Sequence, residues 1–505
     1  MSGETVGKVK KLVRELSLLD ATMIVVGSMI GSGIFLTSAE SARLVGAPGW
    51  LLLAWILAGV MTITGALCVA ELAAMMPRAG GPYVFFREAY SPLVGFLFGW
   101  SQFFIIQTGT IAAVAVAFAN FAGVLMPGIS GSNYIVPPIV LGNYAVSLST
   151  QQFVAVVSIL LLTFVNTRGL DFGKWIQNTF TFTKTAALLA LVVLGIFVGW
   201  NADGAAFSSD WWNSAANGWS VQTAQPQAEA AGSLAILLIL GRAMTGPLFS
   251  QSAWDNVTFT AGEVENPAQN LPRALLVGCL VVVTLYILAN VAYVVTLPLG
   301  AIQNAPQNRV ATVLMEQILG SSGTIIMAIA IMISTFGCNN GLILAGARVY
   351  YAMARDRLFF APLAKTNRHH VPAMALVAQG IWASLLVLPR TVTYNAADAT
   401  PLFGNVYTQL LEYVVSVHLV FNLLSVLAVI VLRRRAPQLE RPYRAWGYPI
   451  IPVIFLILAT LLIVNLAFLA PTTSGIGYLL ALTGIPVYFI WKRRALQDSA
   501  IEAPT

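Results

Sequence analysis

The sequence predicts an all-α integral membrane protein that crosses the bilayer twelve times. Of its 505 residues, 58% are hydrophobic and only 9% are charged, whereas a soluble protein of this size carries about 25% charged residues. Apolar runs recur along the whole chain, and many reach the length of about 20 helical residues that a bilayer core requires. The Lys and Arg residues also gather in alternate connections between these runs. Together these observations exclude a soluble protein.

Short connections separate the predicted spans, and Pro and Gly residues mark many of the joints. Pro272 is expected in the first turn of the seventh span, where a missing N–H costs nothing. No small-residue cleavage motif follows the first apolar run, so we expect a retained span and not a removed signal peptide. The predicted spans are residues 20–44, 49–76, 93–126, 151–167, 176–199, 233–262, 272–297, 318–354, 372–389, 406–432, 449–470 and 474–491.

The basic residues predict the orientation of these spans. With both termini in the cytoplasm, all but five of the 27 Lys and Arg residues face the cytoplasm. Arg43, Arg309 and Arg390 then lie outside, and Lys184 and Arg242 lie within the membrane. This asymmetry is the positive-inside pattern. The net charge of +7 therefore reflects topology, and we expect no nucleic-acid partner.

Two spans carry weak helix formers near their centres. Gly31 lies about 16 Å into the first span from the cytoplasm, at a rise of about 1.5 Å per residue. Gly246-Pro247 lies about 18 Å into the sixth span from the outside. Matching interruptions of opposite orientation are typical of inverted-repeat transporters, so we predict broken helices at the midplane in spans one and six. The alternative, glycines that only allow close helix packing, explains one such stretch better than two.

These interruptions divide the chain into two halves of five spans within a single transporter domain, residues 1–505. The predicted parts are a cytoplasmic tail at 1–17, repeats at 20–199 and 233–432, two additional spans at 449–491 and a second tail at 492–505. Non-helical backbone survives in a bilayer only where it is buried in protein or lines a wet cavity. A broken helix exposes N–H groups that attract a carboxylate and C=O groups that attract a cation. A zwitterion suits such a pair of half-helices.

Several motifs then resemble the amino acid–polyamine–organocation superfamily in order along nearly the whole chain. They are GSGIF (31–35), CVAELAAMMPRAGGPYVF (68–85), GEVENPAQNLPRAL (262–275), ARVYYAMARDRLFFAPLAKTN (347–367) and LERPYRAWGYPIIPV (439–453). The branch that the chain resembles most is the L-type amino acid transporters. Two motifs carry this resemblance, GPLFSQSAW (246–254) and NTFTFTK (178–184). The resemblance implies a leucine-transporter-like fold of five plus five inverted spans and two extra spans.

The resemblance also implies a substrate site at the two interruptions. Backbone N–H groups of Ser32, Gly33 and Ile34 would bind the carboxylate, with the Ser32 hydroxyl assisting. Carbonyls near Met29 and Ile30, and near Phe249 and Ser252 in span six, would bind the amine. Phe249 would be the aromatic gate. The side-chain pocket would draw on Gln107 to Thr110, on residues around Phe336 to Asn340, and on span ten, where the match names no residue.

Lys184 lies eight residues into the fifth span, about 12 Å from its cytoplasmic end, which strains snorkelling of its ammonium to the interface. In the family, this ammonium takes the place of a sodium ion. We hypothesise that Lys184 makes transport sodium-independent and couples substrate binding to movement of span one.

Several other ionisable residues have more than one possible role. Asp255 is a hydrogen-bonded structural carboxylate, a titrating group or a determinant of cationic substrates. Arg242 lines the outer vestibule or reaches the interface. Glu71, Glu263 and Glu265 are candidates for inner-gate ion pairs with Arg78 or Arg273, or solvated helix ends. His418 is expected to be a satisfied core histidine.

The expected function is sodium-independent exchange of neutral L-amino acids by alternating access. Proton-coupled symport, and a permease for cationic amino acids or polyamines that uses Asp255, remain the alternatives. We expect no enzyme activity, cofactor or metal, since no clustered catalytic set is visible. The loop 127–150 lacks the cysteine by which animal members bind a glycoprotein subunit, so we expect no disulfide-linked partner and a prokaryotic plasma membrane.

Overall fold

The computed structural model describes residues 14–201, 203–394 and 401–502. Most of the predicted N-terminal tail and the last three residues of the predicted C-terminal tail lie outside the described residues. Within the described part, ten helices are long and apolar enough to cross a membrane. The predicted spans 151–167 and 372–389 correspond to two shorter apolar helices, Thr150–Asn166 and Ala373–Leu386.

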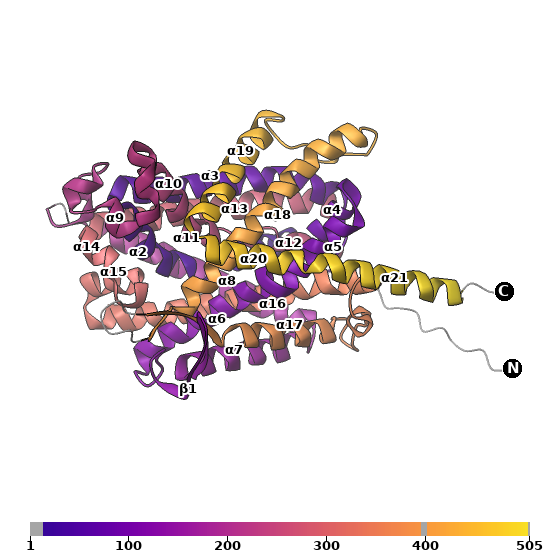
Figure 1. Cartoon of the computed structure of the whole chain (residues 1–505), viewed down its shortest axis with the longest axis horizontal. Helices are drawn as coiled ribbons and strands as arrows, with labels where there is room; N and C mark the ends of the chain where they lie inside the picture. Colours follow the sequence, from indigo (N-terminus) through magenta and orange to yellow (C-terminus); the bar gives the residue numbers. More distant parts are fainter. Residues whose placement is uncertain (1–13, 202, 395–400, 503–505) are drawn as a thin grey trace.

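The elements follow one another as Figure 1 shows. The first half comprises α1 (Leu18–Met29), α2 (Gly33–Val45), α3 (Pro48–Met75), α4 (Pro82–Ala89), α5 (Pro92–Ser101), the π-helix η1 (Gln102–Ile106), α6 (Gln107–Leu125), β1 (Tyr134–Leu141), β2 (Tyr144–Ser149), α7 (Thr150–Asn166) and α8 (Leu170–Phe197). The connection to the second half contains η2 (Ala206–Ser208), η3 (Ser214–Asn217), α9 (Val221–Ala224) and η4 (Pro226–Leu234).

The second half comprises α10 (Ala235–Ala243), α11 (Thr245–Ser250), α12 (Asn256–Phe259), η5 (Ala261–Glu263), α13 (Pro267–Thr296), α14 (Leu299–Gln303), η6 (Pro306–Asn308), α15 (Val310–Leu319), α16 (Ser321–Arg355), η7 (Ala361–Ala364), α17 (Ala373–Leu386), β3 (Pro389–Tyr394), β4 (Pro401–Phe403) and α18 (Val406–Arg435). The last three helices are α19 (Ile450–Leu469), α20 (Pro471–Leu482) and α21 (Gly484–Glu502).

Long helices of the two halves pack against each other and form the core. The helix α13 packs along α3, and α16 packs along α6 and α8. The first helix, α1, lies against α13, α8 and α16. The backbone at the end of α1 is therefore enclosed by protein, as non-helical backbone in a bilayer must be.

The prediction of an all-α fold is wrong in one respect. The loops before α7 and after α17 form a four-stranded antiparallel sheet in the order β1-β2-β3-β4. The strands β1 and β2 are joined by the two-residue turn Gly142-Asn143, and Gly142 has a positive φ of 64°, as one class of two-residue hairpin requires at this position. Two β-rich stretches around Gly-Asn are a hairpin signal in the sequence.

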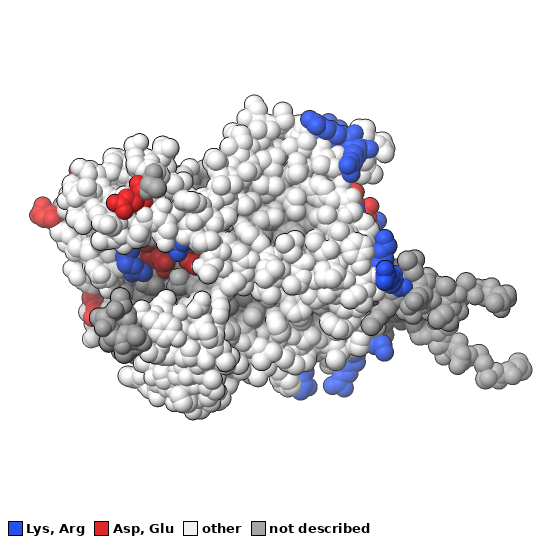
Figure 2. Space-filling view, in the orientation of Figure 1, with Lys and Arg blue, Asp and Glu red and all other residues white. Residues whose placement is uncertain are grey.

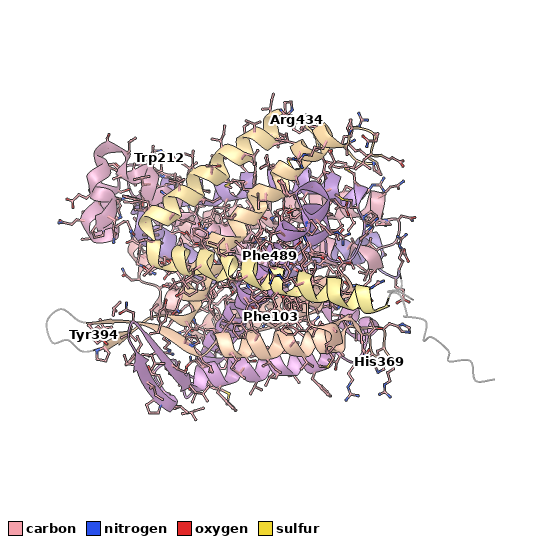
Figure 3. All side chains as sticks on the ribbon, turned by 45° about the vertical axis from the view of Figure 1, so that its right-hand side comes forward. Phe103, Trp212, His369, Tyr394, Arg434 and Phe489 are labelled. Carbon is pink, nitrogen blue, oxygen red and sulfur yellow. The ribbon has the colours of Figure 1, made fainter. Side chains whose placement is uncertain are left out.

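The two ends of the helix bundle differ in charge. Most of the blue surface in Figure 2 lies at the right-hand end, whereas the left-hand end has red surface and a hollow that contains both colours. In Figure 3, Trp212 and Tyr394 lie at the left-hand end and His369 lies toward the right. The connections thus alternate between a basic end and an end that carries the sheet.

Candidate functional site

The first spanning helix is interrupted where the glycines predict it. The helix α1 ends at Met29, Ile30 adopts an extended ψ of 92°, and α2 begins at Gly33. Ser32 precedes α2 but makes no capping bond to it. Its hydroxyl instead donates to Tyr407 Oη over 3.1 Å. The first N–H groups of α2 lack intrahelical partners and receive none from the Ser32 side chain.

The sixth span is also interrupted, but later than predicted. The prediction of a break at Gly246-Pro247 is wrong, because both residues belong to α11. Pro247 lies in the first turn of this helix, where its missing N–H is tolerated. The helix ends at Ser250, and Gln251 to Asp255 are non-helical, with Ala253 at a φ of 63°.

Side-chain donors surround the carbonyls at the end of α1. The Lys184 ammonium donates to the carbonyl of Gly27, and Cys338 Sγ lies 3.2 Å from the carbonyl of Ser28. Tyr286 Oη donates to the Met29 carbonyl over 2.8 Å. The Ser334 hydroxyl lies 3.5 Å from the carbonyls of both Ile30 and Gly31. A carbonyl oxygen has two lone pairs, so each can accept a further donor.

Lys184 lies deep in the protein, with 1% of its surface exposed. It belongs to α8, and its bond to Gly27 links this helix to the last turn of α1. This position excludes snorkelling to the interface.

Two aromatic rings meet beside Ser32, at the interruption of the first helix. Phe249 is buried, and its ring meets that of Tyr407 edge-on with centroids 6.0 Å apart. Tyr407, in the first turn of α18, was not predicted from the sequence. Its partner Ser32 and its neighbour Phe249 both were, so the structure brings these two predicted site residues together around a third.

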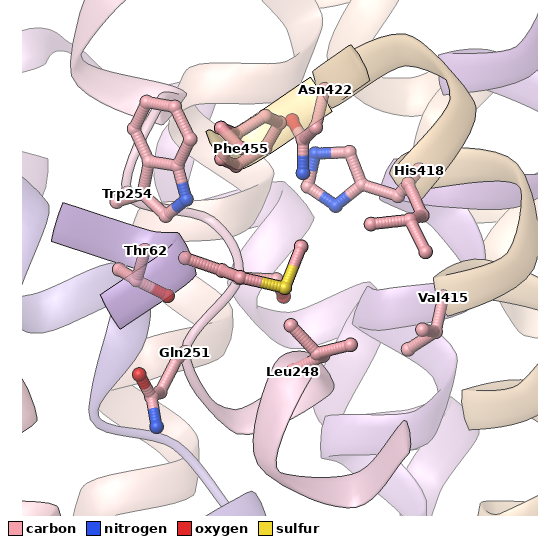
Figure 4. A pocket seen from close by; sticks show the side chains of 11 residues that line it. Thr62, Leu248, Gln251, Trp254, Val415, His418, Asn422 and Phe455 are labelled. Carbon is pink, nitrogen blue, oxygen red and sulfur yellow. The ribbon is translucent and has the colours of Figure 1, made fainter. Parts of the chain in front are cut away.

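Ser252 and Asp255 face a different part of the molecule. Ser252 lines a cavity of about 30 Å³ between the gap in span six and α18, which has room for about one water molecule. Figure 4 shows Trp254, Gln251 and His418 around this cavity, with the Asn422 amide beside the imidazole.

Asp255 is 4% exposed, and its Oδ2 lies 3.8 Å from His418 Nε2. The prediction of a satisfied His418 is wrong, because Nε2 is buried without a hydrogen-bond partner. The carboxylate and the imidazole therefore form a buried pair of titratable groups beside the gap.

Gln107 and Arg242 are not part of the group around Ser32. Gln107 Nε2 donates to the carbonyl of Leu342 over 2.8 Å and so joins α6 to α16. Arg242 pairs with Glu412 at 2.9 Å and donates to the carbonyl of Leu469. Its guanidinium lines a small cavity with Glu40 and Tyr407. Arg242 is thus an ion-pair residue of the wall above Tyr407.

Arg78 and Arg273, the candidate partners from the sequence, are wrong for Glu263 and Glu71. Glu263 pairs with Arg348, through Nε at 2.9 Å and Nη2 at 3.2 Å. Glu71 pairs with Arg433 and lies 3.4 Å from Arg441. Neither involves Arg78 or Arg273, because α16 and α18 bring their own arginines to these carboxylates. The side chain of Glu265 belongs to no ion pair among the described residues.

Two interrupted helices that pack against each other inside a helical membrane bundle are typical of transporters. Residues 16–491 match a family model described as amino acid permease. The chain belongs to this family. The resemblance to the superfamily is thereby confirmed, and the multi-pass helical architecture agrees with it.

Relatives of this permease carry transporter names. It is 29% identical to the mouse large neutral amino acids transporter small subunit 2 over 96% of this chain and 82% of the relative. It is 28% identical to the mouse Asc-type amino acid transporter 1, with the same coverage. A bacterial relative, the serine/threonine exchanger SteT of Bacillus subtilis, is 27% identical over 96% of this chain and 98% of its own.

Among the described residues, no group of three or more His, Cys, Asp or Glu side chains could hold a metal ion. The cysteines Cys68, Cys279 and Cys338 are free and buried.

Proposed function

We propose that this permease exchanges neutral L-amino acids across the membrane by alternating access, without sodium. The observation that carries the proposal is the uncapped start of α2 beside the carbonyl end of α1. The free N–H groups of Ser32, Gly33 and Ile34 suit a carboxylate, and the carbonyls of Met29 and Ile30 suit an ammonium. The names of the relatives, which specify neutral amino acids and an exchanger, support the substrate class.

Lys184 carries the sodium independence in this proposal. Its ammonium already provides a positive charge at the Gly27 carbonyl, where a sodium ion would need carbonyl oxygens as ligands. Since Lys184 extends from α8, a substrate that moves α1 also pulls on α8. Phe249 and Tyr407 form the gate above the substrate in the same proposal.

The topology completes the proposal. We infer twelve crossings in two inverted halves, with α7 and α17 as the two short crossings and both termini in the cytoplasm of a prokaryotic cell. The basic end seen in Figure 2 supports this orientation. The loop 127–150 lacks cysteine, which supports a permease without a disulfide-linked subunit.

Counterflow in proteoliposomes tests the exchange. Vesicles loaded with unlabelled L-leucine or L-serine should take up the labelled amino acid at equal rates in sodium and choline buffers, and empty vesicles should take up little. Uptake that rises with sodium would contradict the role of Lys184. Equal uptake into loaded and empty vesicles would contradict exchange.

Proton-coupled symport is a second candidate, favoured by the Asp255–His418 pair beside the gap of span six. It predicts that an inward proton gradient drives accumulation of amino acid in vesicles with no internal substrate. Exchange predicts no accumulation under these conditions, so the same preparation separates the two candidates.

A further inference from the structure

A large cavity lies above the proposed gate. Its volume is about 470 Å³, which is within the range of about 300–1,000 Å³ of small-molecule sites. Its walls come from α6, the loop before β1, the start of β1, the first turn of α7, η6, the strands β3 and β4, and the start of α18. Tyr407 forms part of its lining and also bonds Ser32. Tyr407 therefore belongs both to the wall of the cavity and to the contacts of the interrupted first helix.

Arg390 places a buried positive charge in this wall. It is 6% exposed and lies on β3. Its Nη atoms donate to Tyr134 Oη over 3.1 Å and to the Gly131 carbonyl over 2.9 Å, while Nε has no partner. Burial lowers the pKa of the guanidinium and Tyr134 raises it, but an arginine stays charged.

Among the described residues, the charge of Arg390 has no counter-charge. In the part of the chain that the structure describes, no carboxylate lies within 4.0 Å of this guanidinium. A buried charge without a partner costs several kcal/mol, and a free N–H without an acceptor adds to that cost. An anionic group in the cavity would satisfy both.

Asn120 supplies the complementary atom. It lies on α6, is 8% exposed and lines the same cavity. Its Oδ1 is buried without a hydrogen-bond partner. A carbonyl oxygen of an amide is an acceptor only, so it suits an ammonium group. The wall of the cavity thus contains one unpaired donor on a cation and one unpaired acceptor, both buried in this structure.

We propose that this cavity is a second, outer binding site for a zwitterionic α-amino acid, with the carboxylate on Arg390 and the ammonium group on Asn120. The proposal rests on the proposed function, since the ligand is the transported substrate itself. A molecule bound here waits above Tyr407 and enters the central site when this side chain moves away from Ser32. The outer site raises the local concentration of substrate at the closed gate.

Binding stoichiometry tests the proposal. Saturation binding of radiolabelled L-serine and L-leucine to the purified full-length permease should show a second molecule per chain. The variant Arg390→Gln should lose this second molecule and keep the first. Arg309→Gln is the matched control, because Arg309 is also an outer arginine whose pKa is lowered by burial, yet it does not line this cavity.

Kinetics provide a second readout. In exchange assays, Arg390→Gln should raise the outer KM by about tenfold or more, the loss that one charged hydrogen bond represents. The maximal rate and the inner KM should stay as in the wild type, because the central site is intact. Arg390→Lys should recover part of the affinity, since it keeps the charge.

A second variant separates ligand binding from loop structure, because Arg390 also bonds Gly131 and Tyr134. Asn120→Leu removes the acceptor and leaves these bonds, and it should abolish the second molecule as well. If Arg390→Gln lost both molecules through misfolding, Asn120→Leu would decide.

Three outcomes would overturn parts of the scheme. A wild-type permease that exchanges amino acids but binds a single molecule per chain contradicts the outer site and leaves the proposed function standing. A permease that neither binds nor exchanges either amino acid contradicts the proposed function itself. A second molecule that persists in Asn120→Leu and Arg390→Gln together would place it elsewhere.

Discussion

Gly33 shows how tightly the two interrupted helices are packed. A Cβ atom added to Gly33 would lie 2.6 Å from Ser250 Cβ and 2.8 Å from Ser250 Cα. The second of these atoms is backbone, so a rotamer change cannot relieve the contact. The glycine thus permits close approach of α2 and α11 as well as an open backbone.

We predict that Gly33→Ala lowers the exchange rate by at least about tenfold, because α2 and α11 must separate and the N–H groups of the site move with them. Gly475→Ala is the control, since Gly475 is a helical glycine with open space around it. Initial rates of counterflow measure both variants. A wild-type rate in Gly33→Ala would contradict close packing as a requirement of the site.

Asp255 belongs to the pair with His418 and not to the group around Ser32. We therefore predict that Asp255→Asn leaves the preference between L-lysine and L-leucine unchanged. Competition of each amino acid against labelled L-serine measures this preference. A shift of about tenfold or more would assign Asp255 to the recognition of cationic substrates, as one alternative from the sequence proposes.

The sequence predicted an element correctly where a single physical property determines the position of that element. Span positions follow from hydrophobic length, and the break at Gly31 follows from residues that form helices poorly. The break in span six was misplaced, because Gly246 serves close packing and not a break. A Cβ atom added to Gly246 would lie 2.6 Å from the Cβ of Thr37. The true gap at Gln251 to Asp255 contains no proline and no glycine. Tertiary contacts keep it open, and a sequence pattern does not contain them.

The residues of the candidate site likewise divide into those that the sequence predicted and those that it did not. Ser32 and Phe249 were predicted because the motifs contain them. Tyr407, Ser334 and Tyr286 come from distant helices whose rotation about their own axes is set only by packing. His418 and Asp255 were both noted in the sequence, but their proximity depends on how α18 lies against the gap of span six.

The ion pair between η5 and α16 supports a stability prediction. Arg348 and Glu263 are each 1% exposed, so Arg348→Ala leaves a buried carboxylate without its partner and should cost about 3–5 kcal/mol. Thermal unfolding in detergent should show a lower midpoint. Replacement of both residues by methionine should recover much of the loss, and an equal loss in the double variant would contradict this account.

At the scale of the whole molecule, the positive-inside pattern predicts which end faces the cytoplasm. Trp212 and Arg434 are both exposed and lie on connections predicted to face opposite sides. We predict that a membrane-impermeant maleimide labels Trp212→Cys on intact cells and labels Arg434→Cys only after permeabilisation. The three native cysteines are buried, so the wild type provides the background. The reverse pattern would invert the topology.

The chain before α1 is bound to the end of the sixth span by backbone hydrogen bonds. Backbone N–H groups of Glu15 and Leu16 donate to the carbonyl of Glu263, each over 2.9 Å, and Leu16 pairs with Val264 as a parallel bridge. Since Glu263 also pairs with Arg348, the start of the first span, the end of the sixth and the end of the eighth meet at one residue.

The pairing of β2 with β3 limits how the two loops that form the sheet can vary. Ala145 is opposite Arg390 in this ladder, and successive side chains of a strand point to opposite faces. A shift of the pairing by one residue would turn every side chain of β3 to the other face and remove the guanidinium from the cavity. Insertions and deletions in either loop are therefore restricted to changes that preserve this pairing, although the two loops belong to different halves of the chain.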